Sequence, residues 1–220
     1  MPLKIIQTED GSQSLYDEEL NETYHSTKGA RGESEYVFLE MGVRSVPARR
    51  LRDCKYQPLN ILEVGFGTGL NALLTWDWAD RNETPIHFLT LEPFPITELV
   101  WSQMDLKEDQ RFVKLHEANW NEAGETSVYF TLEKRMEKLE EFKANGTVDV
   151  IFFDAFAPSK QPEVWSIDNL RRCFNSLRSG GILTTYCAQG QFKRNLAEVG
   201  FQVEVLPGAM GKKEMVRGRK

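Results

Sequence analysis

The feature that most constrains the fold is a regular alternation of apolar, strand-length runs and helix-length segments that begins at residue 59. The run LNILEVG, residues 59–65, ends in a glycine-rich turn, and LNALLTWDWAD, residues 70–80, follows with helical spacing. Strands that alternate with helices predict a parallel sheet covered on both faces. The last two apolar runs are separated only by PGAMGKK, which is too short for a helical crossover, so these two strands are expected to pair antiparallel.

The alternation continues to the end of the chain and predicts an α/β fold with a mostly parallel, seven-stranded sheet. Residues 1–58 are polar and weakly periodic, and we expect them to form an N-terminal arm or cap that contributes to the substrate site. Residues 59–220 are expected to form the sheet domain. The predicted strands span residues 59–65, 87–92, 127–132, 148–153, 181–187, 201–206 and 213–218.

Helices are predicted from periodicity together with terminal signals. KRMEKLEEFKANG, residues 134–146, is charged and amphipathic, and Gly146 is expected to end it. The segment 166–181 is predicted as a helix with Ser166 as its N-cap and Gly180 as its stop. The other predicted helices after the first lie at residues 95–104 and 192–200.

Composition excludes several classes of protein. No apolar run is long enough to cross a membrane, and the first residues lack a secretory pattern, so a cytoplasmic location is expected. The three cysteines are widely separated, without the spacing of a zinc site, which predicts reduced thiols and no metal. A net charge of −6 argues against indiscriminate coating of nucleic acid, although a local basic patch is compatible with it.

The glycine-rich turn EVGFGTGLN predicts a nucleoside cofactor. Gly65, Gly67 and Gly69 follow a G-x-G-x-G spacing, whereas a dinucleotide fold usually has G-x-G-x-x-G. Glu92 ends the second strand, where a carboxylate can accept hydrogen bonds from both ribose hydroxyls. S-adenosylmethionine fits this spacing best. The residues predicted here to bind the cofactor are Glu63, Gly65, Phe66, Gly67, Thr68, Gly69, Asn71 and Glu92.

A second candidate site follows the buried strand VDVIFF. That strand ends at Asp154, and the next turn is stiffened by Pro158 and Pro162. Phe156 in this turn either stacks on a base or belongs to the core, and Trp165 is predicted to be core. Asp154 could simply cap the turn, but its place at the mouth of the sheet favours a functional role.

Four segments together carry a family resemblance: GFGTGLN, DAFAPSKQPEVW, GGILTTYCAQGQFKRNLAEVGF and GKKEMVRG. They resemble the methyltransferase domain of the bacterial tRNA 5-methylaminomethyl-2-thiouridine enzyme, over a stretch from about Tyr16 to Gly218. The resemblance implies a Rossmann-like, class I S-adenosylmethionine-dependent methyltransferase. It also implies methyl transfer to the primary amine of 5-aminomethyl-2-thiouridine at the wobble position of tRNA.

In many members of that family the domain is fused to an oxidase that uses FAD. This sequence leaves no room for such a domain, so we expect a stand-alone methyltransferase whose aminomethyl substrate is supplied by a separate enzyme. The family also carries a Gly-Asp pair after the third strand that meets the adenine amino group. Here the stretch reads FTLEKRMEKL, and Glu133 is the candidate substitute.

Methyl transfer needs an amine with a free lone pair aligned with the sulfonium. Asp154 is predicted to accept an N–H of the amine, to aim its lone pair and to stabilise the cation that forms. Bulk solvent, or Asp154 with a pKa raised by burial, could take the proton. Phe156 is predicted to stack on an extruded base. The residues predicted to contact substrate or tRNA are Tyr24, Ser26, Pro158, Lys160, Lys193, Arg194, Lys212 and Lys213.

Three other functions remain open at this point. A small-molecule amine N-methyltransferase or an aminopropyltransferase would share the fold and an acidic site. An NAD-dependent oxidoreductase is opposed by the glycine spacing. A non-catalytic RNA-binding protein is opposed by an intact glycine turn together with Glu92 and Asp154.

Overall fold

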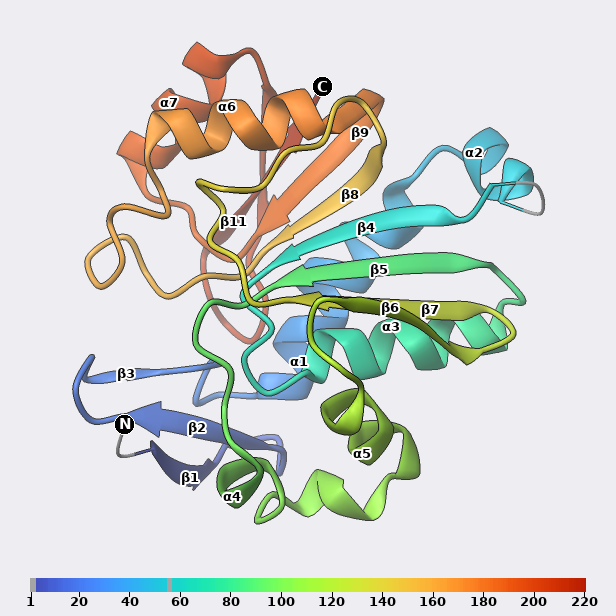
Figure 1. The fold of residues 1–220 in the computed structure, drawn as a ribbon. Coiled ribbons are helices and arrows are strands. Elements are labelled where there is room, and N and C mark those ends of the chain that lie inside the picture. The colour runs from blue at the N-terminus through green and yellow to red at the C-terminus, as the bar shows by residue number, and fades with distance from the viewer. Residues whose placement is uncertain (1–2, 55–56) are drawn as a thin grey trace.

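The structure, a computed structural model, describes residues 3–54 and 57–220. A large sheet with helices on both faces forms the body, and a small sheet made by the N-terminal residues lies beside the carboxyl ends of its strands (Figure 1). The large sheet has the order β10-β11-β9-β8-β4-β5-β7-β6. Its strands are β4 (Leu59–Val64), β5 (Ile86–Leu91), β6 (Glu122–Ser127), β7 (Phe130–Arg135), β8 (Val148–Phe153), β9 (Leu177–Thr185), β10 (Gln202–Pro207) and β11 (Glu214–Arg219).

The pairing confirms the predicted fold class. Strands β9, β8, β4, β5 and β7 are parallel, and β10 and β11 form the predicted antiparallel hairpin. Strand β4 lies between β5 and β8, so the order of the chain reverses beside it, which is where such sheets bind ligands. The helices of the body are α3 (Leu70–Arg81), α4 (Glu98–Trp101), η3 (Asp105–Glu108), α5 (Gln110–Glu117), α6 (Ile167–Ser176) and α7 (Gly190–Val199).

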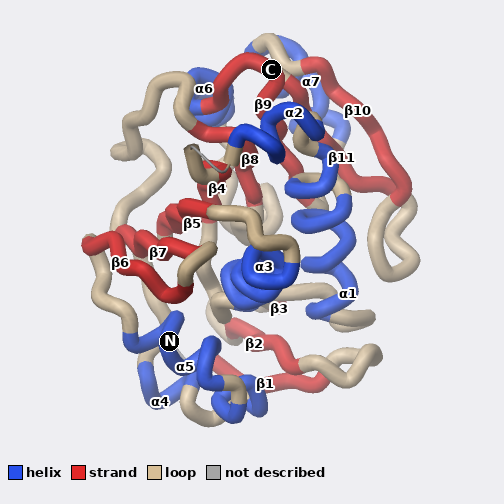
Figure 2. Tube along the Cα trace, turned by 90° about the vertical axis from the view of Figure 1, so that its right-hand side faces the viewer, coloured by secondary structure: helices blue, strands red, loops and turns tan. Residues whose placement is uncertain are grey.

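Two apolar clusters fill the faces of the sheet, because alternate strand side chains point to opposite sides. Phe152 and Ile182 pack toward α3 and the N-terminal helices, whereas Phe153 and Leu183 pack toward α6 and α7. Figure 2 shows α3 and α1 on the same side of the sheet. Burial on both faces explains why five of the six residues of VDVIFF are apolar.

The sheet has eight strands rather than the predicted seven. Strand β6 is an edge strand of mostly exposed, polar residues, EAGETS, and therefore gives no hydrophobic signal. It pairs antiparallel with β7. The predicted strand 127–132 instead contains the turn of this hairpin, where Val128 is 87% exposed.

The helix predicted at 134–146 is wrong. Lys134 is the fifth residue of β7, and loops and turns follow that strand. The amphipathic spacing arises because Leu139 and Phe142 anchor this loop in the core. Lys134 is fully buried, and its Nζ donates to the carbonyls of Leu115 and His116 at the end of α5, at 2.8 and 2.9 Å.

The predicted helix after Asp154 is right at its start and wrong at its end. The Ser166 hydroxyl caps α6 by accepting from the Asn169 N–H. The helix ends at Ser176, however, and Gly180 lies inside β9. Leu177 is fully buried and begins the strand, so sheet packing overrides the helical pattern there.

The N-terminal residues form a small antiparallel sheet of order β1-β2-β3. The turn between β1 and β2 holds the start of α1: Ser12 Oγ accepts from the N–H groups of Ala30 and Arg31, both at 3.2 Å, and Asp10 Oδ2 accepts from Gly32 N at 3.1 Å. The elements of this region are β1 (Leu3–Gln7), β2 (Gln13–Asp17), β3 (Glu22–Thr23), α1 (Ala30–Ser34), the π-helical turn η1 (Glu35–Glu40), η2 (Val43–Ser45) and α2 (Ala48–Asp53).

Helix α2 is tied to the amino end of β8 by one buried carboxylate. Asp149 accepts from Arg50 Nε and Nη2 at 2.7 and 2.8 Å and from the Asn60 N–H at 2.8 Å. Arg178 Nε lies 2.9 Å from its Oδ1. Within residues 3–54 and 57–220, no helix has the length and apolarity needed to span a bilayer.

Candidate functional site

A cavity of about 720 Å³ opens at the carboxyl ends of β4, β5 and β8, between the large sheet and the N-terminal sheet. Its walls come from the turns that follow these strands, from the segment before α1, and from the turn between β10 and β11. This is the crevice in which open α/β sheets bind ligands, and its volume suits a nucleoside.

The glycine turn forms one wall. Gly65, Gly67 and Gly69 have φ of +94°, +52° and +76°, which favours glycine at each position. A Cβ added at Gly65 would lie 2.7 Å from the carbonyl oxygen of Asp154, so only glycine lets the two strand ends approach this closely. The Asp154 N–H donates to the Val64 carbonyl at 3.0 Å. The close packing of these two strand ends therefore requires glycine at position 65.

Glu92 joins this turn to the end of β5. Its carboxylate accepts from the N–H groups of Gly67 at 3.2 Å and Phe94 at 3.0 Å. Burial raises its pKa, while these backbone donors lower it. Glu92 lines the cavity, as a ribose-binding carboxylate must.

Asp154 lies on the cavity wall directly after β8. Asn71 Nδ2 donates to its Oδ2 at 2.8 Å. Burial raises the pKa of Asp154 to about 7; the Glu33 carboxylate also raises it, whereas the Asn71 hydrogen bond and the Lys212 ammonium lower it. A carboxyl group with this pKa can accept and release a proton near neutrality.

Aromatic side chains surround the space in front of Asp154. The rings of Tyr24 and Phe156 meet edge to face with centroids 4.9 Å apart. The Tyr186 hydroxyl donates to the Ala155 carbonyl at 2.9 Å. Tyr24, Phe156 and Tyr186 all line the cavity, so Phe156 is part of the site. Trp165 is 5% exposed, which confirms that it is core.

An ion pair between α1 and the turn before β11 lines the cavity. Lys212, in the turn before β11, pairs with buried Glu33 of α1, and its Nζ lies 4.8 Å from the centre of the Tyr186 ring. Glu33 also accepts from the Ser26 N–H at 2.9 Å. These contacts place Ser26 and Lys212 at the cavity, as predicted for substrate contacts.

His25 is another cavity residue that the sequence did not indicate. Its Nδ1 lies 3.1 Å from Ser14 Oγ. Burial, and then the nearby Lys212 ammonium, lower the pKa of His25 to about 4, so it is neutral at physiological pH. Among the described residues, eight carboxylate side chains and only two lysines line the cavity. This charge balance suits a cationic ligand.

The predicted cofactor residues divide into two groups. Gly65, Phe66, Gly67 and Glu92 line the cavity. The remaining predicted cofactor residues do not line it: Glu63, Thr68, Gly69, Asn71 and Glu133.

The residues outside the cavity have other partners. Glu63 is fully buried in β4 beneath the turn, and Asn71 supports Asp154. Thr68 is buried, and its carbonyl lies 3.1 Å from His116 Nε2. Gly69 begins α3.

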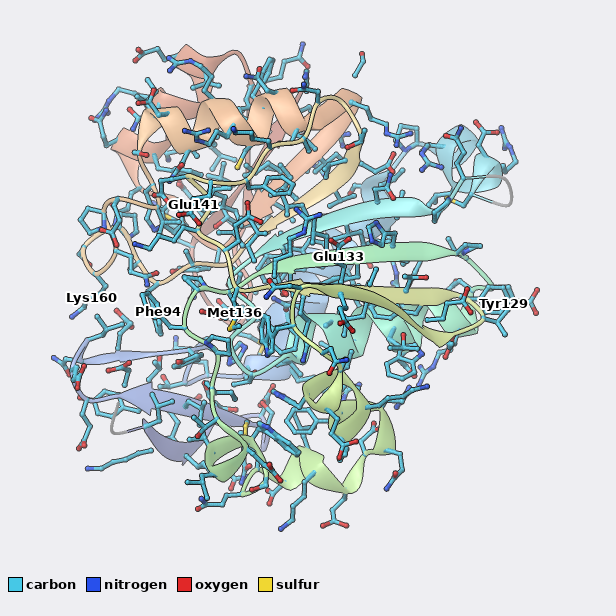
Figure 3. The ribbon with its side chains drawn as sticks, viewed as in Figure 1. Phe94, Tyr129, Glu133, Met136, Glu141 and Lys160 are labelled. Carbon is cyan, nitrogen blue, oxygen red and sulfur yellow. The ribbon has the colours of Figure 1, made fainter. Side chains whose placement is uncertain are left out.

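The structure places Glu133, the predicted adenine contact, outside the residues that line the cavity. Its carboxylate lies 3.1 Å from His87 Nε2 and accepts from Arg135 Nε at 2.7 Å, over the strands β5 and β7. Figure 3 shows Glu133 on the sheet and away from Phe94, which lines the cavity. The loop after β7 supplies Glu137 and Leu139 to the cavity instead.

The predicted tRNA contacts are also divided. Tyr24, Ser26 and Lys212 line the cavity, whereas the others do not. Lys193 Nζ donates to Glu214 at 3.1 Å, and Arg194 donates to Gln191 at 2.7 Å. The residues outside the cavity are Pro158, Lys160, Lys193, Arg194 and Lys213.

Residues 105–220 match the model of a protein family described as S-adenosyl-L-methionine-dependent methyltransferase. The chain belongs to this family. Residues of the cavity fit its cofactor, because Gly65 and Gly67 present backbone without a side chain to the cavity and Glu92 offers a carboxylate beside them. No cluster of three or more His, Cys, Asp or Glu side chains that could hold a metal occurs in the described part of the methyltransferase.

Curated relatives of this methyltransferase are much longer. It is 30% identical over 212 residues to the tRNA 5-methylaminomethyl-2-thiouridine biosynthesis bifunctional protein MnmC of Leptospira borgpetersenii, covering 90% of this chain and 32% of that protein. MnmC of Aromatoleum aromaticum is 31% identical to it over 244 residues, covering 99% of this chain and 35% of that protein. The chain thus spans about a third of the relatives' length.

Two solved structures show the same fold. MnmC2 from Aquifex aeolicus superposes with a TM-score of 0.79 at 24% identity, covering 99% of this chain and 69% of that one. A spermidine synthase in complex with the transition-state analogue AdoDATO superposes with a TM-score of 0.60 at 14% identity, covering 99% of this chain and 69% of that one. At these identities the likeness concerns the fold alone.

Proposed function

We propose that this methyltransferase transfers a methyl group from S-adenosylmethionine to the primary amine of 5-aminomethyl-2-thiouridine at the wobble position of tRNA. The observation that carries the proposal is the pairing of the glycine turn and Glu92 with Asp154, a buried carboxyl in a cavity of aromatic and acidic side chains. The similarity to proteins of tRNA 5-methylaminomethyl-2-thiouridine biosynthesis supports the same acceptor.

In this proposal Gly65, Gly67 and Glu92 hold the cofactor, which supplies an electrophilic methyl group on a sulfonium. The methyl carbon passes to the amine nitrogen, and the electron pair of the broken carbon–sulfur bond stays on sulfur. The acceptor amine is an ammonium in water and must lose a proton before its lone pair can attack. Asp154 accepts that proton and later releases it to solvent, a role that contributes about 100–10,000-fold to such reactions.

The aromatic walls complete the acceptor site. Tyr24, Phe156 and Tyr186 exclude water from the reacting nitrogen and offer ring faces to its positive charge. The uridine must leave its stack to reach Asp154, and Phe156 can stack on the extruded base. Alignment of amine and methyl group is then the main source of rate.

Cations outside the cavity are proposed to contact the tRNA backbone. Lys213 is exposed in the turn before β11. Gly211 belongs to the same turn, and Lys28 Nζ lies 3.4 Å from the position that a Cβ added at Gly211 would take. Lys28 was not among the residues that the sequence indicated. The other proposed backbone contacts, together with the turn residue Pro158, are Lys160, Lys193 and Arg194.

Residues 1–58 are proposed to act as a cap on the acceptor side of the methyltransferase domain, residues 59–220. The cap supplies Tyr24 and Glu33 to the cavity, which supports this division. We further propose a cytoplasmic location, where tRNA and the cofactor meet, and a separate enzymatic activity that uncovers the aminomethyl group.

The test is mass spectrometry of nucleosides after the protein acts on tRNA that carries 5-aminomethyl-2-thiouridine. A single methyl group gained at that nucleoside, and lost with Asp154→Asn, is the expected result. No methyl gain despite measured cofactor binding would overturn the tRNA assignment.

A second candidate acceptor is a small free amine, which the eight cavity carboxylates favour. Methylation of a diamine, or of the free nucleoside, at a rate equal to that of tRNA would support this acceptor over tRNA.

A further inference from the structure

A group of buried polar atoms lies behind Asp154, outside the cavity. Glu63 and Thr90 are neighbours across the parallel strands β4 and β5. Both are completely buried, and Asn71, in the first turn of α3, is 4% exposed. Both carboxyl oxygens of Glu63, the hydroxyl of Thr90 and Asn71 Oδ1 lack a hydrogen-bond partner among the described residues. Buried polar atoms without partners are rare, so this group requires a physical explanation.

The orientation of the Asn71 amide is the first step of that explanation. Its Nδ2 donates to Asp154 Oδ2 at 2.8 Å, so Oδ1 points away from Asp154. The opposite orientation would place an amide oxygen against a carboxylate and would remove the only side-chain donor that Asp154 has within the described residues. A hydrogen-bond donor on the side away from Asp154 must therefore bind Asn71 Oδ1.

An ionised Glu63 cannot hold it, because a carboxylate and an amide oxygen are both acceptors. A neutral Glu63 has one O–H and one carbonyl oxygen. The O–H can donate to Asn71 Oδ1. This gives Asn71 Oδ1 and one oxygen of Glu63 a partner without any further donor, while the Thr90 hydroxyl stays without one among the described residues.

We propose that Glu63 is a positioning residue that stays protonated and, through its O–H, fixes the Asn71 amide so that Nδ2 faces Asp154. Asn71 in turn orients the carboxyl group that receives the acceptor amine. The inference rests on the proposed function only for its consequence in catalysis, not for the hydrogen-bond arrangement. It assigns Glu63 to the support of Asp154 rather than to the cofactor.

Burial has the largest effect on the Glu63 carboxyl and favours its neutral form. Burial raises the pKa of Glu63 well above its ordinary value, and the like charges of Asp154 and Glu92 raise it further, while Thr90 and Asn71 lower it. The charged groups that face Asp154 are Glu33 and Lys212, which raise and lower its pKa respectively.

The decisive variants are Glu63→Gln and Glu63→Leu. Glutamine offers the same donor and acceptor without a charge, so it keeps the Asn71 amide in place. Leucine removes the donor and frees the amide, which weakens the hydrogen bond to Asp154. Thr90→Val is the matched control, because it removes a buried hydroxyl from the same group without removing the partner of Asn71.

The first measurement needs no activity: titration of the Asp154 carboxyl carbon by NMR in the protein without cofactor. We expect the same midpoint in wild type, Glu63→Gln and Thr90→Val, and a higher midpoint in Glu63→Leu. If Glu63 were ionised, both Glu63 variants would remove a like charge and lower the midpoint. That result, or an unchanged midpoint in Glu63→Leu, would overturn the proposal.

The second measurement separates kcat from KM with the tRNA substrate. Glu63→Leu is expected to lower kcat about tenfold, and to move the acid limb of its pH profile upward, while Glu63→Gln restores both. Cofactor affinity should stay within about twofold in both variants. A tenfold loss of cofactor affinity in Glu63→Gln would make Glu63 a direct ligand and overturn the proposal. No methyl transfer by any variant, with the NMR result intact, would count against the proposed function alone.

Discussion

Asp149 and Asp154 lie at opposite ends of strand β8 and have opposite surroundings. Asp149, at the amino end, is 3% exposed and is bound by two arginines and one backbone N–H. Asp154, at the carboxyl end, has one amide donor and faces a cavity. The first carboxylate is surrounded by compensating charge and fastens α2 to the sheet. The second lacks a direct counter-ion among the described residues, and its raised pKa makes it available for chemistry.

The largest expected effect is on activity at the carboxyl end. Asp154→Asn should lower kcat by about 100–10,000-fold, because the amide cannot accept the proton of the acceptor amine. The free energy of unfolding should not fall, since no ion pair is lost. Steady-state kinetics and urea unfolding of the same preparation measure both quantities. A variant that loses stability but keeps activity would reverse the roles assigned to the two aspartates.

The next effect is on stability at the amino end. Asp149→Asn should lower the free energy of unfolding by about 3 kcal/mol, because it leaves the guanidinium groups of Arg50 and Arg178 without their carboxylate. Cofactor affinity of the folded protein should stay unchanged, because Asp149 lies at the far end of the strand. Chemical unfolding measures the change in stability, and cofactor titration measures the affinity. In the double variant with Arg50→Met, part of the loss should be recovered.

The comparison also predicts a pH dependence. With a pKa of about 7 for Asp154, kcat should rise as pH increases through 7. Asp154 also binds its proton more tightly in the folded than in the unfolded chain. Its contribution to stability is therefore greatest at low pH and is lost as pH rises from about 4 to 7. Unfolding of wild type and Asp154→Asn across this range should show that difference in slope; parallel curves would contradict it.

The smallest expected effect concerns the ion pair that lines the cavity. Lys212→Met removes the ammonium that lowers the pKa of Asp154, so the acid limb of the kcat profile should move to higher pH. Glu33→Gln removes a carboxylate that raises the pKa of Asp154, and should move the acid limb of the kcat profile to lower pH. Profiles of both variants, measured with saturating cofactor, provide the check. Shifts in the same direction would mean that neither charge acts on Asp154 directly.

Local sequence was sufficient to place the glycine turn, Glu92 and Asp154 at one edge of the sheet. The glycine turn, Glu92 and Asp154 each follow directly after an apolar strand, and the carboxyl ends of parallel strands meet at one edge. Strand position thus fixed where these residues lie. It did not distinguish residues that line the cavity from those beneath it, because the burial of Glu63 and Asn71 depends on how α3 packs on the sheet.

The prediction from local sequence was wrong where one pattern is compatible with two different structures. The charged stretch after Glu133 has helical spacing, but Leu139 and Phe142 anchor a loop, and Lys134 belongs to a strand. Glu133, just before this stretch, lies within β7, and its side chain pairs with His87 and Arg135. Strand β6 gave no signal because edge strands do not need apolar residues.

The sequence by itself determined the α/β class, the position of the glycine turn, and the carboxyl groups at the ends of β5 and β8. Those features depend on periodicity and on residues close together in the chain. Only the tertiary structure brought Glu33 of the N-terminal segment against Lys212 and placed His25 in the cavity. Such contacts join residues far apart in the chain, and no local preference encodes them. They arise because the N-terminal segment and the β10–β11 hairpin meet at the same mouth of the parallel sheet, where burial raises the pKa of Asp154 and their charges adjust it.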